Sequence, residues 1–308
     1  MKVTEHIQQK TPWISFEIVP PIRGTNCTDI ISLIDSLVQY HPPFIDVTSH
    51  VSEKLYSEGK ERVIRKRPGT LGICALIQHK YRIDAVPHVL CNGFTREETE
   101  DFLIELQYLS IKNVLALQGD KPNFVKKVME SRSQNKYAVD LVRQIQKMNN
   151  GIYLDAQADK TSFCIGVAGY PEKHFLAPDL ETDLQHLKNK IIAGADYITT
   201  QMFFDNSYYF NFIELCKQRG INVPIIPGLK IITSMKQLEG IPRRFSVTIP
   251  SLLEEEVRTA KEKNVSEIGV LWATQQVQEL LDRGVPGVHF YVMNSTEAVK
   301  KVLSSIRR

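Results

Sequence analysis

The sequence of 308 residues lacks the features that mark several classes of protein. No apolar run approaches the roughly 18 residues that a membrane-spanning helix needs, and the polar first ten residues do not resemble a signal peptide. The five cysteines are scattered, without a C-x-x-C pair or a histidine pair at metal-ligand spacing. A net charge of only +3, spread along the chain, argues against nucleic acid as a partner. We therefore expect a soluble, cytoplasmic protein with no zinc, nucleic-acid or membrane partner.

The sequence also lacks the glycine-rich loops that bind nucleotide phosphates. No G-x-G occurs anywhere, the first expected strand is followed by Pro20 and Pro21, and no G-x-x-x-x-G-K-[ST] loop is present. This disfavours a Rossmann nucleotide site. A barrel can still bind a nucleotide through its loops and helix N-termini.

The composition is that of an ordinary globular protein. Hydrophobic residues make up 43% of the chain and charged residues 24%, which is enough to build a sizeable core. No segment has the composition of a linker, so we expect residues 1–308 to form one domain. The one basic cluster, at 60–67, is expected to be a solvated helix face or loop rather than a contact with an anionic ligand.

Apolar runs alternate with helical patterns along the whole chain. A capping box formed by Thr95 and Glu98 marks the clearest helix, with apolar residues following at helical spacing. Eight strands separated by helices indicate a (β/α)8 TIM barrel with additional helices. The strands are expected at 13–19, 44–48, 85–91, 113–120, 163–168, 197–204, 224–229 and 288–293.

Two carboxylates are the leading candidates for catalysis. In a barrel, catalytic residues collect at the carboxyl ends of the strands, where Glu17 and Asp120 are expected on opposite sides of the rim. Glu17 lies among apolar residues, so burial should raise its pKa and suit it to be a general acid, unless it pairs with a buried Arg or Lys. Asp120 could stabilise a developing cation or bind N–H donors of a heterocycle, or it could cap the next segment.

Other polar residues at strand ends or on helices are weaker candidates. Asp183, His186 and Lys190 form one stripe that begins at the N-terminus of a helix. It could hold a ribose and a phosphate but could also be a solvated face. Gln201 lies in an apolar strand and needs hydrogen-bond partners that a ligand could supply. His174 comes just after the fifth expected strand, and His88 lies towards the end of the third, behind Pro87. Either could be structural or functional.

A set of short motifs, in order from about residue 16 to residue 294, resembles the methylenetetrahydrofolate reductase family in its bacterial form, which has the catalytic domain only. Each motif is weak alone, and their order and spacing together make the resemblance specific. The motifs are SFEIVPP at 15–21, DVTS at 46–49, PHVLC at 87–91, LALQGD at 115–120, AGYPEKH at 168–174, AGADYITTQMFFD at 193–205, IIPGL at 225–229 and HFYVMN at 289–294.

The resemblance implies a cytoplasmic flavoprotein of one-carbon metabolism and methionine biosynthesis. Such an enzyme has a barrel that binds FAD without a Rossmann motif, takes a hydride from NADH or NADPH, and passes it to 5,10-methylenetetrahydrofolate in a ping-pong mechanism. The product is 5-methyltetrahydrofolate, and the enzyme is a homo-oligomer. Glu17 would be the general acid, and Asp120 would tune the flavin and stabilise the 5-iminium cation.

Further site residues follow from the resemblance by motif position. Gln201 and Gln237 would contact the folate. The FAD contacts would be Thr48, His88, Gln118, Gly119, Asp120, Tyr137, Ala138, Tyr170, His174, Asp183, His186 and Lys190.

This chain departs from the family pattern at three positions. Gln118 stands where the family usually has Arg, Ile241 replaces an aromatic residue, and Ser295 replaces an Arg. We expect weaker contacts to FAD and to the folate at these positions.

The alternative to a folate reductase is a barrel lyase or aldolase acting on a phosphorylated substrate. Lys190 would be its Schiff-base or phosphate residue, and Lys230 is the only obvious lysine after a strand.

Overall fold

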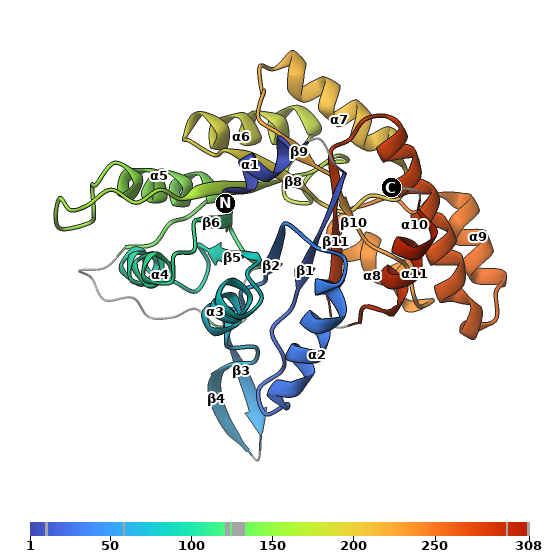
Figure 1. The fold of residues 1–308 in the computed structure, drawn as a ribbon, viewed down its shortest axis with the longest axis horizontal. Helices are drawn as coiled ribbons and strands as arrows, with labels where there is room; N and C mark the ends of the chain where they lie inside the picture. Colours follow the sequence, from blue (N-terminus) through green and yellow to red (C-terminus); the bar gives the residue numbers. More distant parts are fainter. Residues whose placement is uncertain (10–11, 58, 121–123, 125–132, 294, 307–308) are drawn as a thin grey trace.

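The chain folds into a ring of parallel strands surrounded by helices (Figure 1). The computed structural model describes residues 1–9, 12–57, 59–120, 124, 133–293 and 295–306. Around the ring the strands follow the order β10-β11-β1-β2-β5-β6-β7-β8-β9. Their bounds are β1 (Trp13–Ile18), β2 (Phe44–Val47), β5 (Asp84–Leu90), β6 (Asn113–Leu117), β7 (Cys164–Gly169), β8 (Tyr197–Thr200), β9 (Ile225–Ile226), β10 (Gly228–Leu229) and β11 (Gly287–Met293).

Two short strands together take the seventh position of the ring. β9 pairs with β8 through Ile225 and Ile198, whereas β10 pairs with β11 through Gly228 and His289. Pro227 separates them, since a proline has no N–H for a strand ladder. Its carbonyl oxygen still accepts the N–H of His289 at 2.9 Å. The predicted (β/α)8 barrel is confirmed, with its seventh strand broken in two.

Most helices cover the outside of the barrel, and a continuous apolar layer lies between them and the strands. The predicted capping box is present: Thr95 Oγ1 accepts the Glu98 N–H at 3.2 Å, and Glu98 accepts the Thr95 N–H at 2.9 Å. The helix bounds are α1 (Val3–Ile7), α2 (Cys27–Val38), α3 (Thr70–Lys80), α4 (Arg96–Tyr108), α5 (Ala138–Asn149), α6 (Leu180–Ile192), α7 (Asn206–Gln218), α8 (Lys236–Phe245), α9 (Ser251–Thr259), the 3-10 helix η1 (Glu262–Asn264), α10 (Val265–Asp282) and α11 (Glu297–Ser305).

The basic cluster at 60–67 was wrongly predicted to be a helix face or loop. Its first part forms β4 (Lys60–Arg65), which pairs with β3 (Ser52–Ser57) in an antiparallel hairpin that projects from the barrel (Figure 1). Most side chains of this hairpin are exposed or half-buried, so the sequence has no buried-strand pattern there. The short helices α1 and α8 were not predicted either; α8 contains Pro242, which weakens a helical pattern.

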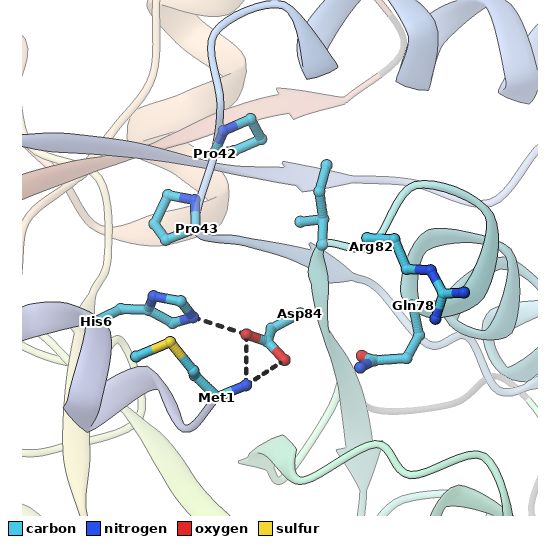
Figure 2. A pocket seen from close by; sticks show the side chains of 8 residues that line it. Met1, His6, Pro42, Pro43, Gln78, Arg82 and Asp84 are labelled. Atoms are coloured by element: carbon cyan, nitrogen blue, oxygen red, sulfur yellow. Dashed lines mark hydrogen bonds and ion pairs between the residues drawn. The ribbon is translucent and has the colours of Figure 1, made fainter.

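The helix α1 closes the barrel at the amino ends of the strands. Val3 is fully buried among barrel residues such as Phe44 and Tyr197, and its N–H donates to Asn113 Oδ1 at 2.8 Å. A surface hollow of about 420 Å³ opens beside this helix, where Asp84 accepts hydrogen bonds from the amino group of Met1 and faces His6 at 2.7 Å (Figure 2). Polar side chains of the predicted site belong to the opposite end of the barrel, so this hollow is separate from it.

Gly166 leaves room for a large side chain in the barrel interior. It is the Cα partner of Leu115 on one neighbouring strand and of Tyr197 on the other. A Cβ at this position would lie 2.3 Å from Cζ of the fully buried Tyr197 ring. Gly166 therefore lets Tyr197 fill the centre of the barrel.

Gly166→Ala should lower the free energy of unfolding, because the added methyl group overlaps a ring that has no free space to enter. Overpacking of this kind costs about 1–3 kcal/mol. Urea unfolding followed by circular dichroism measures the effect. Gly72→Ala is the control: Gly72 is exposed on α3, a Cβ there meets nothing within 4 Å, and the change should be neutral or stabilise by up to about 1 kcal/mol. Equal unfolding free energies for the two variants would contradict this packing.

Candidate active site

Three ionisable side chains meet inside the barrel near the carboxyl ends of the strands. Glu17 of β1 and Asp46 of β2 are Cα partners in the parallel ladder, so their side chains lie on the same face. His88 of β5 faces both: its Nε2 lies 3.4 Å from Glu17 Oε2 and 3.5 Å from Asp46 Oδ2. Their relative exposures are only 8% for Glu17, 1% for Asp46 and 5% for His88. Two buried carboxyl groups therefore compete for one imidazole nitrogen.

Burial raises the pKa of Glu17 from 4.5 to about 7, because removal from water penalises the charged carboxylate. His88 and Lys230 lower the pKa of Glu17 and Asp46 raises it, each by less than burial does. Burial also raises the pKa of Asp46 well above its usual range and lowers the pKa of His88. Near neutral pH, Glu17 is thus balanced between its acid and its base form, which suits a residue that gives up a proton.

Lys230 and Tyr291 lie beside this cluster. Lys230 Nζ donates to the carbonyl oxygen of Tyr291 at 2.9 Å, and the Tyr291 hydroxyl donates to the carbonyl oxygen of Thr200 at 2.5 Å. Burial lowers the pKa of Lys230 to about 8, although Glu17 opposes that shift. Among the described residues, the ion-pair contact of Glu17 is with His88 and not with a lysine or arginine. The alternative for Glu17 was an ion pair with a buried Arg or Lys. Lys230 lowers the pKa of Glu17, but the two side chains make no ion pair among the described residues.

Asp46 was given no role by the sequence analysis. It lies in β2 among Phe44, Ile45 and Val47, all of which are buried. A carboxylate within so apolar a strand is the same signal that singled out Glu17. Asp46, the first residue of the motif DVTS, therefore carries a sequence signal of a site residue.

Asp120 lies apart from the buried cluster, in the loop after β6. Its side chain is 81% exposed and accepts a hydrogen bond from Arg244 Nη2 of α8 at 2.8 Å. Gly119 before it has a φ of +81°, which glycine adopts without strain. An exposed ion pair stabilises a fold only weakly, so the Asp120 carboxylate can exchange this partner for a ligand.

The loop after β6 also approaches the start of α5. Gln118 Nε2 donates to the carbonyl oxygen of Lys136 at 3.2 Å. The next two residues are Tyr137, whose side chain is half exposed, and Ala138. The predicted FAD contacts of these two segments are thus brought side by side.

A second polar cluster joins the end of β7 to one side of α6, from Asp183 in its first turn to Lys190 in its last. Asp183 Oδ2 accepts the N–H of His174 at 2.9 Å, and the rings of His174 and Tyr170 meet edge-on with 4.5 Å between centroids. Lys190 Nζ donates to the carbonyl oxygen of Ala168 at 2.6 Å. Burial lowers the pKa of Lys190 to about 8, with Asp183 acting against that shift. The predicted stripe therefore lies against a strand end, with His186 on the exposed side of the helix.

Three further predicted residues have polar atoms that find no partner among the residues the structure describes. Gln201 Oε1 accepts the Met202 N–H at 2.9 Å and Gln237 Oε1 accepts the Thr233 N–H at 2.7 Å, but neither amide nitrogen donates to a described residue. Thr48 Oγ1 is buried and has no hydrogen-bond partner in the described part of the chain. These atoms are available to a ligand.

The positions that depart from the family pattern are placed differently. Ile241 is buried in an apolar cluster of α8 and its neighbours, whereas Ser295 is exposed. Asn294, which ends the last motif, lies outside the described residues.

The described residues contain no group of three or more His, Cys, Asp or Glu side chains placed to hold a metal ion. Within the same part of the chain, every helix is too short or too polar to cross a membrane.

The chain is similar to one family over nearly its whole length. The family model described as methylenetetrahydrofolate reductase matches residues 2–307. Methylenetetrahydrofolate reductase 1 of Schizosaccharomyces pombe is 30% identical over 298 residues, which are 95% of this chain and 45% of the yeast protein. The 5,10-methylenetetrahydrofolate reductase of Pectobacterium carotovorum subsp. carotovorum is 30% identical over 291 residues, 92% of this chain and 86% of that protein. The chain thus spans about half the length of the eukaryotic relatives and most of the bacterial one.

Among solved structures, the chain resembles an uncharacterised protein from Clostridium thermocellum that is described as binding two copies of 5-methyl-5,6,7,8-tetrahydrofolic acid. The TM-score is 0.60 at 12% identity, and the match covers 99% of this chain and 97% of the other. At this identity, the likeness shows that the two share a fold.

Glu17→Gln should make the free energy of unfolding less sensitive to pH. The folded-state pKa of Glu17 is raised, so its ionisation opposes folding, and stability is lost as the pH rises from about 4.5 towards about 7. A shift of this size corresponds to roughly 3 kcal/mol at most. Relative to wild type, Glu17→Gln should therefore gain stability between pH 5 and pH 8, as measured by urea unfolding.

The matched control is Glu239→Gln, which removes an exposed carboxylate of α8 and should show no such gain. A stability difference between Glu17→Gln and wild type that stays constant with pH would mean that Glu17 ionises as freely as a surface carboxylate.

Proposed function

This chain belongs to the methylenetetrahydrofolate reductase family, and we propose that it reduces 5,10-methylenetetrahydrofolate to 5-methyltetrahydrofolate. NADH or NADPH would supply the hydride, FAD would carry it, and the two half-reactions would alternate in a ping-pong cycle. The observation that carries this proposal is Glu17, a buried acid inside the barrel with a pKa of about 7. Residues 1–308 would form a single FAD-binding barrel domain.

The residues around the rim fit FAD in two respects. The Thr48 hydroxyl is buried without a partner in the described chain. The Lys190 ammonium is desolvated and has a carbonyl partner, but it has no carboxylate within ion-pair distance among the described residues. The desolvated ammonium of Lys190 suits the negatively charged diphosphate of FAD, and the unpaired hydroxyl of Thr48 suits a polar edge of its ring system. When bound, FAD supplies hydride transfer between the nicotinamide and the folate.

The proposed FAD site combines the cluster at α6 with the loop after β6 and the strand ends. Its members are Thr48, His88, Gln118, Gly119, Asp120, Tyr137, Ala138, Tyr170, His174, Asp183, His186 and Lys190. The short distances within the α6 cluster support its part of this assignment.

Glu17 is proposed to supply the proton that opens the five-membered ring of the folate. Protonation of the ring amine makes it a leaving group, and the ring opens to the 5-iminium cation. The Glu17 carboxylate that remains is then close to a positive charge that it stabilises. Asp120 at the exposed rim would add a second negative charge that favours the cation and tunes the flavin.

Gln201 and Gln237 are proposed to bind the folate. Each side chain is held through its oxygen, which leaves the amide N–H groups to donate to acceptor atoms of the substrate. Gln118, Ile241 and Ser295 replace an Arg, an aromatic residue and an Arg of the family pattern, and contacts at those three positions would be weaker.

Family membership does not favour the alternative of a barrel lyase or aldolase. Lys230, the strand-end lysine that such an enzyme would use, donates to the carbonyl oxygen of Tyr291 and acts electrostatically on Glu17. Assembly as a homo-oligomer and a cytoplasmic location stay predictions.

Purified protein should show a flavin absorbance band that bleaches anaerobically on addition of NADH or NADPH and returns on addition of methylenetetrahydrofolate. Glu17→Gln should leave the bleaching unchanged but slow the return by about 100-fold or more, since general acid catalysis contributes at least that factor. Rapid-mixing absorbance separates the two steps. Protein that stays colourless after FAD is added would refute the proposal.

Lys190→Met should weaken FAD binding without changing the fold. Loss of a charge-assisted contact of roughly 1.5–3 kcal/mol would raise the Kd for FAD by at least about tenfold. Flavin fluorescence quenching measures the Kd. Lys188→Met, on the same helix α6, is the matched control and should bind FAD as wild type does; equal losses in both variants would count against the assigned phosphate contact.

A further inference from the structure

Asp46 is a buried carboxyl group whose presence the proposed reaction has not yet explained. Its side chain is 1% exposed, and Oδ1 has no hydrogen-bond partner among the residues that the structure describes. Oδ2 faces His88 Nε2 at 3.5 Å, beside the contact that the same nitrogen makes with Glu17. A charged carboxylate in such a place is costly unless it is paired or shares a proton.

The groups that face this pair carry too little positive charge to balance two carboxylates. Around Glu17 they are His88 of β5, Lys230 after β10 and Tyr291 of β11. Tyr197 of β8 and Cys74 of α3 also face Asp46, and both are neutral groups whose pKa burial raises further. Burial lowers the pKa of His88 and of Lys230, so neither holds a full positive charge as readily as it would in water.

We propose that Asp46 is a positioning residue for Glu17: the two carboxyl groups face the same nitrogen, His88 Nε2, and their mutual repulsion keeps one proton on the pair, available to Glu17, at neutral pH. This inference rests on the proposed acid role of Glu17. Two carboxylates that meet at one site repel each other when both are charged, so the pair gives up its last proton at a higher pH than Glu17 would alone.

The same arrangement helps the step that follows. When Glu17 gives its proton to the folate amine, the pair is left with two negative charges near the new iminium cation. The attraction between the pair and the cation is then greater than that of Glu17 alone. His88 Nε2 lies within 3.5 Å of both carboxyl groups, so it contacts each member of the pair.

The test is the pH dependence of the folate half-reaction in Asp46→Asn. Removal of the second ionisable carboxyl should move the pH at which this rate falls to half its maximum downward by about one unit or more, which is a tenfold change in the acid equilibrium. At pH 8 the rate in Asp46→Asn should then be about tenfold below that of wild type, and at about pH 5 the two rates should be close, while bleaching by NADH is unchanged. A merely structural role would lower the rate equally at every pH.

An unchanged midpoint pH in Asp46→Asn would overturn the proposal. Asp84→Asn, at the opposite end of the barrel, is the control and should leave the profile of the wild type in place. If Asp46→Asn fails to fold, Asp46→Ser gives the same readout with a smaller neutral side chain.

A second readout does not need activity. A protonated carboxylic acid gives an infrared carbonyl band, and the band that is absent from Glu17→Gln is assigned to Glu17. In wild type this band should persist at neutral pH. In Asp46→Asn it should be lost at a lower pH than in wild type. If the band titrates at the same pH in both, the proposal fails. If the pH at which the band titrates changes as expected but the protein reduces no folate, the inference about the carboxyl pair holds and the proposed function fails.

Discussion

Burial of two carboxyl groups against one imidazole is the constraint on which this structure depends. Glu17, Asp46 and His88 are almost inaccessible to water, and none of the described residues around them supplies a matching positive charge in full. A fold can hold such a cluster only if the rest of it is rigid enough to prevent escape of the side chains to water. The barrel provides that rigidity, because each of the three residues projects from a strand with a strand on either side.

The two ends of the barrel have different tasks. At the amino ends of the strands, Phe44, Tyr197 and their neighbours form an apolar interior that α1 closes. At the carboxyl ends, polar side chains face inward or lie on the loops, where a ligand can reach them. The apolar floor excludes water from below the acid, which keeps the pKa of Glu17 high. Stability and chemistry are therefore separated along the barrel axis.

Much of the fold could be predicted from the sequence, since buried parallel strands are continuous apolar runs and short turns separate them from helices. The hairpin β3–β4 could not, because its side chains are largely exposed and have no apolar period. Helix α8 was missed because Pro242 weakens its pattern.

The site was predictable only in part. Glu17 was singled out because a polar residue in an apolar strand is unusual, and the same reasoning applied to Asp46 would have singled it out too. Its contact with His88 could not be predicted, because the stagger of the strands β1, β2 and β5 decides which side chains meet in the interior. The pairing of Asp120 with Arg244 of α8 likewise depends on a helix that the sequence did not reveal.

The most direct test of this account is the ionisation of Glu17 itself. Carbon-13 NMR of protein labelled at the glutamate side-chain carboxyl, with Glu17→Gln used to assign the signal, follows the protonation of Glu17 across the pH range. The account predicts that Glu17 titrates near pH 7, well above the usual value of 4.5. A midpoint near 4.5 would mean that Glu17 is ionised at neutral pH. It would contradict both the effect of burial on the pKa of Glu17 and the proton that the carboxyl pair is proposed to keep.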